Sequence, residues 1–334
     1  MNRRSGNWGE KLIDFSRRNI RIWSLLGPGG ALSTAAMELG EVKPEVQMMT
    51  ADLNYYSGLK RFSKAYPGRL INVGIAEQNL IGVAAGLAKE GYMPFANTYA
   101  SFCASRCVDQ IRVNMAYMKL PIKLIGLSAG LDAGVLGATH MAVEDLALMR
   151  SLPNITVLSP ADCTEIIKAI LASSETLDPT YIRLTGPMNM PIVYNEDYDF
   201  QIGKAVEIRQ GRDICIIATG SMVYHAVRAA ELLEIKGISC AVINMHTVKP
   251  LDTEAVDAMQ DKKMIVTVEE ASIIGGLGSA VAEYLALQKN RPYQIMLGIR
   301  DSFPTAGSYD YLLKQCRLTG EQIAEDIISA LSRE

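Results

Sequence analysis

One short stretch, residues 70–89, constrains the fold of this chain more than any other. Its sequence, LINVGIAEQNLIGVAAGLAK, starts with an apolar run typical of a buried strand, turns at Gly74, and continues with apolar residues at the spacing of one helical face. Glu77 stands where the strand ends and the helix begins. Open α/β sheets bind ligands in this crevice, but the helix dipole alone also favours an acid there, and that is the commoner case. The stretch by itself does not decide between the two roles.

Composition excludes several classes of function. With 334 residues, 49% of them apolar and 21% charged, the chain is an ordinary globular protein of about two domains. A net charge of −3 and the lack of a basic stripe with interleaved aromatic residues disfavour nucleic acid and membrane surfaces as partners. No apolar run approaches the roughly 18 residues of a spanning helix, and residues 1–19 lack the apolar segment of a secretory signal. We therefore expect a cytoplasmic protein.

Cysteines and histidines give no sign of a metal centre. The six cysteines are scattered, without a CxxC pair, and the three histidines are dispersed. This pattern predicts free thiols in a reducing compartment and no metal ligands on this chain.

Short apolar strands alternate with helices along the chain, which predicts mostly parallel sheets covered on both faces. Residues 186–203 are rich in proline, asparagine and acids, as is typical of a domain boundary. The predicted division is an N-terminal arm (1–24), a first α/β domain (25–190), a linker (191–203) and a second α/β domain (204–334).

Four groups of residues resemble the transketolase family, in the same order and with matching spacing over about residues 25–332. They are GIAEQN with GVAAGLA (74–88), NTYASF…DQIR (97–112), GATH with RSLPNITVLSPAD (137–162), and VEE…GGLGSAV (268–281). The chain is most similar to the C-terminal half of a transketolase or of a 1-deoxyxylulose-5-phosphate synthase. This resemblance implies two three-layer α/β domains, a pyrimidine-binding domain for thiamine diphosphate followed by a transketolase C-terminal-like domain.

The family divides its cofactor site between two domains. One binds the diphosphate and its Mg2+ through a Gly-Asp-Gly…Asn element, and the other holds the aminopyrimidine ring. This sequence contains no Gly-Asp-Gly. The resemblance therefore implies a partner subunit that carries the diphosphate half and the Mg2+ ligands, and self-association to an α2β2 heterotetramer.

The resemblance also assigns roles to cofactor-binding residues. Glu77 matches the glutamate that hydrogen-bonds N1′ of the pyrimidine and stabilises its imino form, which accepts the proton from the thiazolium C2. Tyr99 and Phe102 match aromatic residues that pack on the ring, and Ile75 lines the same pocket. Without the surrounding match, such aromatic residues are more typical of an ordinary core.

Two further site residues follow from the same match. Asp52 corresponds to an acid at the end of the first strand, near the subunit interface, and is placed with the cofactor-binding residues. His140 corresponds to a histidine that contacts the donor hydroxyls, and with Glu77 it forms the predicted catalytic pair. A lone histidine after a glycine-rich loop is otherwise typical of a residue satisfied by backbone.

The substrate positions depart from the family pattern. Ser128 and Leu136 stand where the family has a histidine and an aspartate for the donor, and Gly186 and Gly29 stand where it has arginines for the sugar phosphate. Ser57 lies near a phosphate-contacting serine of the family.

Loss of two guanidinium forks removes the geometry best suited to a phosphate. We therefore expect a donor other than an ordinary sugar phosphate: a non-phosphorylated ketose, a deoxy sugar or a sulfonated sugar. Arg106, Arg183 and Lys60 are candidate substitute cations, although each is also typical of solvated surface charge.

The predicted function is that of the small subunit of a split, thiamine diphosphate-dependent transketolase, which moves a two-carbon ketol unit from a ketose to an aldose. The alternatives are the β subunit of a related carboligase or oxo-acid dehydrogenase, and a catalytically degenerate scaffolding partner. Glu269 and Glu270 are expected to be polar residues at a strand end, in a second domain that serves subunit packing.

Overall fold

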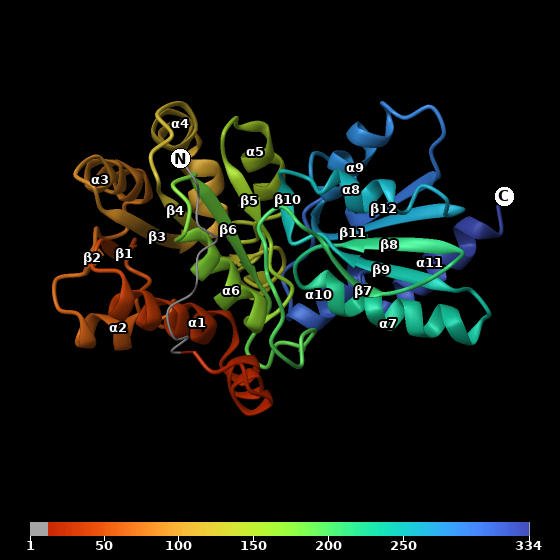
Figure 1. Ribbon diagram of the computed structural model, residues 1–334, viewed down its shortest axis with the longest axis horizontal. Coiled ribbons are helices and arrows are strands. Elements are labelled where there is room, and N and C mark those ends of the chain that lie inside the picture. Colours follow the sequence, from red (N-terminus) through yellow and green to blue (C-terminus); the bar gives the residue numbers. More distant parts are fainter. Residues whose placement is uncertain (1–12, 334) are drawn as a thin grey trace, which may run out of the picture.

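The computed structural model describes residues 13–333, which form two α/β units lying side by side (Figure 1). Each unit is built round a sheet of mainly parallel strands with helices on both faces, so the predicted fold class is confirmed. The first twelve residues of the predicted N-terminal arm lie outside the described residues.

The first sheet has seven strands in the order β10-β5-β6-β4-β3-β1-β2. They are β1 (Val46–Thr50), β2 (Leu70–Asn72), β3 (Met93–Tyr99), β4 (Lys123–Ala129), β5 (Thr156–Leu158), β6 (Thr180–Thr185) and β10 (Thr247–Lys249). Neighbouring strands are parallel except for β10, which is antiparallel to β5. Strand β1 is buried at every position, as expected when both faces of a parallel sheet are covered.

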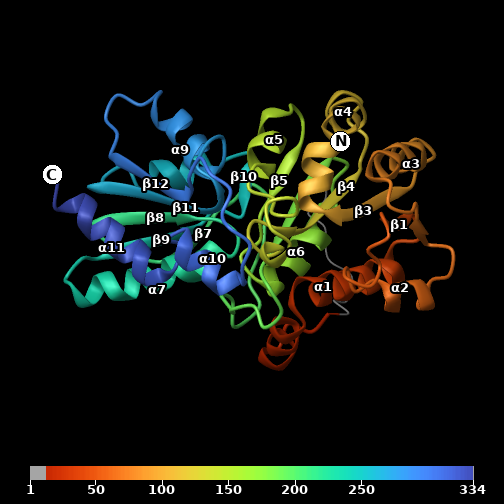
Figure 2. The ribbon, with the colours of Figure 1, turned by 180° about the vertical axis from the view of Figure 1, so that it is seen from behind.

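Helices of the first unit divide between the two faces of its sheet. One face carries α1 (Arg17–Val42), α2 (Lys60–Ala65) and α6 (Cys163–Ser173), and the other carries α3 (Glu77–Lys89), α4 (Val108–Ile111) and α5 (Asp145–Ser151), as Figures 1 and 2 show. Helix α1 is kinked at Gly27, whose φ of 70° leaves the helical region, and Pro28 starts the second segment. Proline fits there because the first position of a helix needs no N–H.

The second sheet has five strands in the order β12-β11-β8-β9-β7. They are β7 (Val206–Arg209), β8 (Ile214–Ala218), β9 (Cys240–Asn244), β11 (Met264–Ser272) and β12 (Tyr293–Ile299), of which only β7 pairs antiparallel. Helices α8 (Thr253–Asp257) and α9 (Leu277–Leu285) cover one face. The other face carries α7 (Met222–Ile235), α10 (Tyr309–Gln315) and α11 (Gly320–Leu331) (Figure 2).

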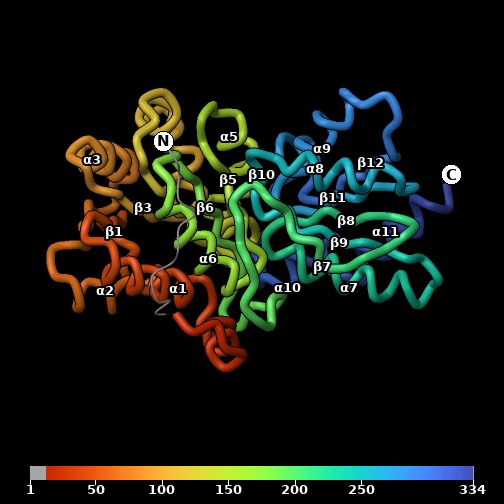
Figure 3. The backbone as a smooth tube through the Cα atoms, viewed as in Figure 1, coloured from red at the N-terminus to blue at the C-terminus, as the bar shows by residue number. Residues whose placement is uncertain are grey.

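The two units are joined through shared structure at their seam. Strand β10 belongs to the second half of the sequence but extends the first sheet beside β5 (Figure 3). One buried apolar cluster runs through the seam and includes Tyr181 of β6 together with Ile217 of β8 and Ile243 of β9. The sequence did not predict this exchange, because a three-residue strand carries little periodicity of its own.

Residues 102–117 form an irregular helical segment. Two π-helical segments, η1 (Phe102–Arg106) and η2 (Arg112–Tyr117), flank the short helix α4. Segments of π-helix are rare and occur often at functional sites, because the wider turn redirects side chains. Here η1 carries two residues of the predicted site, Phe102 and Arg106.

Candidate functional site

The candidate site lies at the carboxyl edge of the first sheet, where β2, β3 and β4 end. Because neighbouring parallel strands end at the same edge, residues distant in sequence meet there. Glu77 begins the helix after β2, Tyr99 ends β3, and His140 closes the glycine-rich loop after β4. With Phe102, which follows β3, four of the predicted site residues lie close together at this edge.

Glu77 is the buried charge of this site. Its side chain is only 4% exposed, and its Oε2 accepts a hydrogen bond of 2.7 Å from Nη1 of Arg106, whose side chain is 47% exposed. Gly74, with a φ of 75°, makes the turn from strand to helix. A carboxylate whose partner is a half-exposed side chain can exchange that partner for a ligand without breaking the core.

Aromatic rings form one side of the site. The guanidinium carbon of Arg106 lies 4.4 Å from the centroid of the Phe102 ring, within the range of a cation–π contact. His140 packs edge-on against both Phe102, at 5.1 Å between centroids, and Tyr99, at 5.5 Å. Partial burial raises the pKa of the Tyr99 hydroxyl, so this ring stays neutral at physiological pH. The group offers flat apolar faces next to one carboxylate.

His140 is held at its other side by its own loop. Its Nδ1 lies 2.9 Å from the hydroxyl oxygen of Thr139, and its backbone N–H donates to the carbonyl of Gly137 at 3.0 Å. These local contacts fix the end of the loop and engage Nδ1 of the His140 ring.

Ile75 and Asp52 lie at the same edge of the sheet but contact other groups. The Ile75 side chain is 79% exposed, and Asp52, at a φ of 62° after β1, accepts a hydrogen bond from the Asn72 amide at 2.9 Å. Asn72 also accepts from the backbone N–H groups of Asp52 and Gly74, so these two ligand-facing turns are tied together.

The predicted replacement cations are placed differently from what the sequence suggested. Arg183 is not available to a substrate, because it is buried and its Nε donates to Asp145 at 2.8 Å. Arg106 is committed to Glu77. Lys60 starts α2 and is exposed.

Backbone geometry disfavours a side chain at Gly29 and at Gly186, the two positions that the resemblance matches with phosphate-binding arginines. A Cβ atom on Gly29 would lie 2.7 Å from the carbonyl oxygen of Tyr56, so any side chain there requires the backbone to move. Gly186 has a φ of 97°, which side chains rarely adopt. The neighbouring Ser57 hydroxyl is buried and has no hydrogen-bond partner among the described residues.

Glu269 and Glu270 lie near the end of β11, and both have structural roles that the sequence did not predict. Both side chains are buried, at 1% exposure each. Glu269 accepts hydrogen bonds from the N–H groups of Leu277 and Gly278 and so caps α9. Burial raises its pKa to about 7. Sequence reasoning missed these roles because the partners of each carboxylate come from other elements.

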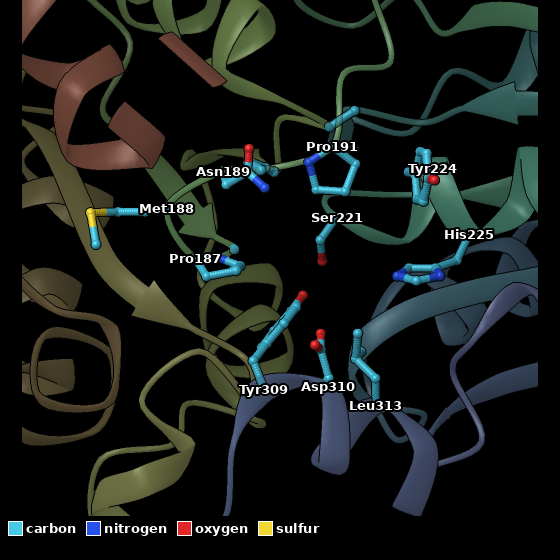
Figure 4. Close-up of a pocket in the computed structure, with 13 residues that line it drawn as sticks. Pro187, Met188, Asn189, Pro191, Ser221, Tyr224, His225, Tyr309, Asp310 and Leu313 are labelled. Carbon is cyan, nitrogen blue, oxygen red and sulfur yellow. The ribbon is translucent and has the colours of Figure 1, made fainter. Parts of the chain in front are cut away.

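A separate cavity of about 330 Å³ lies at the seam between the units. Figure 4 shows Ser221 and Tyr309 pointing toward one another across it, with His225 and Asp310 beside them and Pro187 and Leu313 supplying apolar walls. Burial lowers the pKa of His225, so its ring is neutral at pH 7.

Two kinds of feature, a metal-ligand cluster and a membrane-spanning helix, are lacking in the part of the chain that the structure describes. Within residues 13–333 no group of three or more histidine, cysteine, aspartate or glutamate side chains is arranged to hold a metal ion. Over the same residues, no helix combines the length and the hydropathy needed to cross a membrane.

Comparison with known proteins agrees with this geometry. A model of the transketolase pyrimidine-binding domain matches residues 29–188, and one of the transketolase C-terminal domain matches residues 203–323. A subunit of 6-deoxy-6-sulfo-D-fructose transketolase from a Clostridium species (strain MSTE9) is 42% identical over 86% of this chain and 89% of its own length. The chain belongs to the transketolase family.

Two other relatives of this transketolase-family chain share its length. One of the subunits of the apulose-4-phosphate transketolase of Phocaeicola vulgatus is 34% identical over 89% of this chain and 95% of its own length. A solved structure described as a split gene transketolase, an inactive β4 tetramer, superposes with a TM-score of 0.81 at 38% identity, covering 90% of this chain and 97% of that one. The predicted family is therefore confirmed, in its split form.

Proposed function

We propose that this chain is the C-terminal subunit of a split transketolase that transfers a two-carbon ketol unit from a ketose donor to an aldose acceptor. The observation that carries this proposal is the buried carboxylate of Glu77, held by one half-exposed arginine and opening beside aromatic rings. A scaffolding protein has no need for a carboxylate in such a place, since burying a charge is costly.

The residues of the site fit the pyrimidine half of thiamine diphosphate. Glu77 is the acceptor for N1′, the rings of Tyr99 and Phe102 supply a flat apolar face, and Ile75 closes the pocket from the exposed side. The cofactor supplies the carbanion chemistry, while this chain binds and orients the ring and keeps its exchangeable proton in place. Binding requires Arg106 to share or release the Glu77 carboxylate.

The diphosphate and Mg2+ belong, in this proposal, to a partner subunit. Support comes from the lack of a Gly-Asp-Gly element and from large apolar side chains exposed near the site, among them Ile75, Tyr55, Tyr56 and Leu136. A solved relative consisting of β chains alone is described as inactive. Open space beside Gly82 and Gly86 on α3 allows close packing of a second copy, consistent with an α2β2 heterotetramer. The proposed location of this complex is the cytoplasm.

For the donor we propose a sugar whose anion is not held by the usual two arginines, with a sulfonated ketose favoured. Gly29 and Gly186 leave no room for those arginines, and a relative of 42% identity is named for a sulfonated fructose. The alternatives stay a non-phosphorylated or deoxy ketose.

Reconstitution with the subunit that carries the Gly-Asp-Gly element tests the proposal. We expect ketol transfer only from the mixture, with kcat/KM for 6-deoxy-6-sulfofructose above that for xylulose 5-phosphate or fructose 6-phosphate. Equal or better use of ordinary sugar phosphates would overturn the donor assignment alone. Decarboxylation of an oxo acid without any ketol transfer would overturn the transketolase assignment and favour the carboligase or dehydrogenase alternative.

A further inference from the structure

Glu270, near the end of β11 in the second unit, accepts three hydrogen bonds through its side chain. Its Oε1 accepts from the backbone N–H of Leu131 at 2.7 Å, and its Oε2 accepts from the hydroxyls of Tyr309, at 2.6 Å, and Ser221. These donors come from the loop after β4, the start of α10 and the residue before α7. The Glu270 carboxylate therefore connects three elements of the second unit, β11, α7 and α10, to a loop of the first unit.

That loop, residues 128–140, is the one that presents His140. Its base is closed by backbone pairing of Gly130 with Ala142. Glu270 lies directly against this base, because a Cβ atom on Gly130 would come within 2.3 Å of its Oε1. Leu131 directly follows Gly130, so the hydrogen bond from Leu131 to Glu270 fixes the backbone where it leaves this pair.

The second unit forms the floor of the same loop. Leu131, Met141 and Val143 are buried in the core cluster of the second unit rather than in that of the first. The N–H of Ser272, two residues after Glu270, donates to the carbonyl of Val143 at 2.7 Å. Both ends of the loop are therefore fixed by β11.

A buried ion pair braces the backbone of Glu270 from the other side. Arg183 Nη2 donates to the Glu270 carbonyl at 2.8 Å and to the Ala142 carbonyl at 3.2 Å, while its Nε is paired with Asp145. Tyr181 donates its hydroxyl to the same Asp145 oxygen. Burial raises the pKa of the Glu270 carboxyl, and the positive charge of Arg183 opposes this rise.

We propose that Glu270 is a positioning residue for the donor sugar, which acts from the second unit by fixing the loop that carries His140. This inference rests on the proposed function, in which His140 contacts the donor. It gives the C-terminal domain a part in substrate geometry beyond subunit packing.

Two substitutions at neighbouring carboxylates test this role in the reconstituted complex. We expect Glu270→Ala to raise KM for the donor by roughly tenfold or more, with thiamine diphosphate affinity changed by less than about twofold, because only the loop is released. Glu270→Gln keeps an acceptor for Leu131 N–H and should restore most of the loss. Glu269→Ala is the matched control: it removes an equally buried carboxylate that caps α9 and does not touch the loop.

Amide hydrogen exchange of the complete chain gives a readout that does not depend on turnover. In Glu270→Ala, and more weakly in Tyr309→Phe, amides of residues 131–140 should exchange faster, while those of α3 stay as in the wild type. Equal KM changes in the Glu269 and Glu270 variants, or unchanged loop exchange, would overturn the proposal. If the wild-type complex shows no ketol transfer, the proposed function fails, and the exchange result still decides whether Glu270 holds the loop.

Discussion

Glu77 and Glu270 are both buried carboxylates, one in each α/β unit, yet they are satisfied in opposite ways. Glu77 has a single side-chain partner, Arg106, and that partner is half exposed. Glu270 accepts hydrogen bonds from three groups, the N–H of Leu131 and the hydroxyls of Ser221 and Tyr309, which lie on three different elements. A carboxylate with one half-exposed partner can take a ligand instead, whereas one with three partners from separate elements holds those elements together.

The apolar side chains around the two carboxylates also differ: they are exposed near Glu77 and buried near Glu270. Apolar side chains such as Ile75 and Leu136 are exposed around the first, as at a site that another chain covers. Around the second, Leu131 and Val143 are packed into the core of the second unit. In the proposed function, Glu77 with its one half-exposed partner belongs to the reacting site, and Glu270 with its three partners belongs to the support of that site.

The largest expected effect is on turnover through Glu77. Glu77→Ala should reduce kcat of the reconstituted complex by at least about a thousandfold, because the carboxylate that orients the pyrimidine is lost. Glu90→Ala, an exposed acid at the end of the same helix, is the control and should leave kcat unchanged. Activity of Glu77→Ala within tenfold of the wild type would remove the assigned role.

Breaking the ion pair beneath the Glu270 support should have the next largest effect. Asp145→Ala leaves Arg183 buried without its counter-charge and should lower the free energy of unfolding by about 3–5 kcal/mol. Glu254→Ala breaks the exposed pair with Lys204 and should leave the free energy of unfolding almost unchanged, because solvent screens that pair. Urea unfolding of the two variants measures the contrast, and similar losses would show that the Arg183 pair gives the seam no special support.

Glu269 predicts a pH dependence of stability. Its pKa is raised by burial from 4.5 to about 7 in the folded chain, so the folded state binds the proton more tightly than the unfolded state. This contribution to stability is complete below pH 4.5 and is lost as the pH rises through about 7, by at most about 3 kcal/mol. The wild type should therefore lose stability relative to Glu269→Gln between these pH values. A difference that is flat, or that grows in the wild type's favour, would contradict the raised pKa.

The smallest effect concerns the missing phosphate arginines. Gly29→Ala should destabilise the isolated chain by about 1–3 kcal/mol, because the added Cβ meets the Tyr56 carbonyl. Gly82→Ala, in open space on α3, should instead stabilise it by up to about 1 kcal/mol. Thermal unfolding compares the two variants. An unchanged stability of Gly29→Ala would show that the backbone at this position can accept a side chain, as an arginine there would require.

Sequence reasoning went furthest where a local motif carries the chemistry. The strand, the turn at Gly74 and the helix from Glu77 were predicted from the residues themselves. The family resemblance gave Tyr99, Phe102 and His140 separate roles, and the structure shows that their rings are in contact. The pairing of Arg106 with Glu77 was missed, although both were named, because a contact across 29 positions has no local signature.

Contacts between the units could not be predicted for a similar reason. The burial of Glu270, the Arg183–Asp145 pair and the joining of β10 to the first sheet each depend on how two sheets meet. Charged residues are rarely buried without partners, and the partners of Glu270 lie on elements that are distant in the sequence. The buried Glu270 therefore lies at a position that depends on the packing of both units.

Calorimetric titration of thiamine diphosphate with Mg2+ tests the central claim most directly, which is that this chain provides only the pyrimidine half of a shared site. We expect weak binding to this chain alone and at least a hundredfold tighter binding once the partner subunit is added, with the gain much reduced by Glu77→Ala. Binding to the isolated chain as tight as to the complex would contradict the claim.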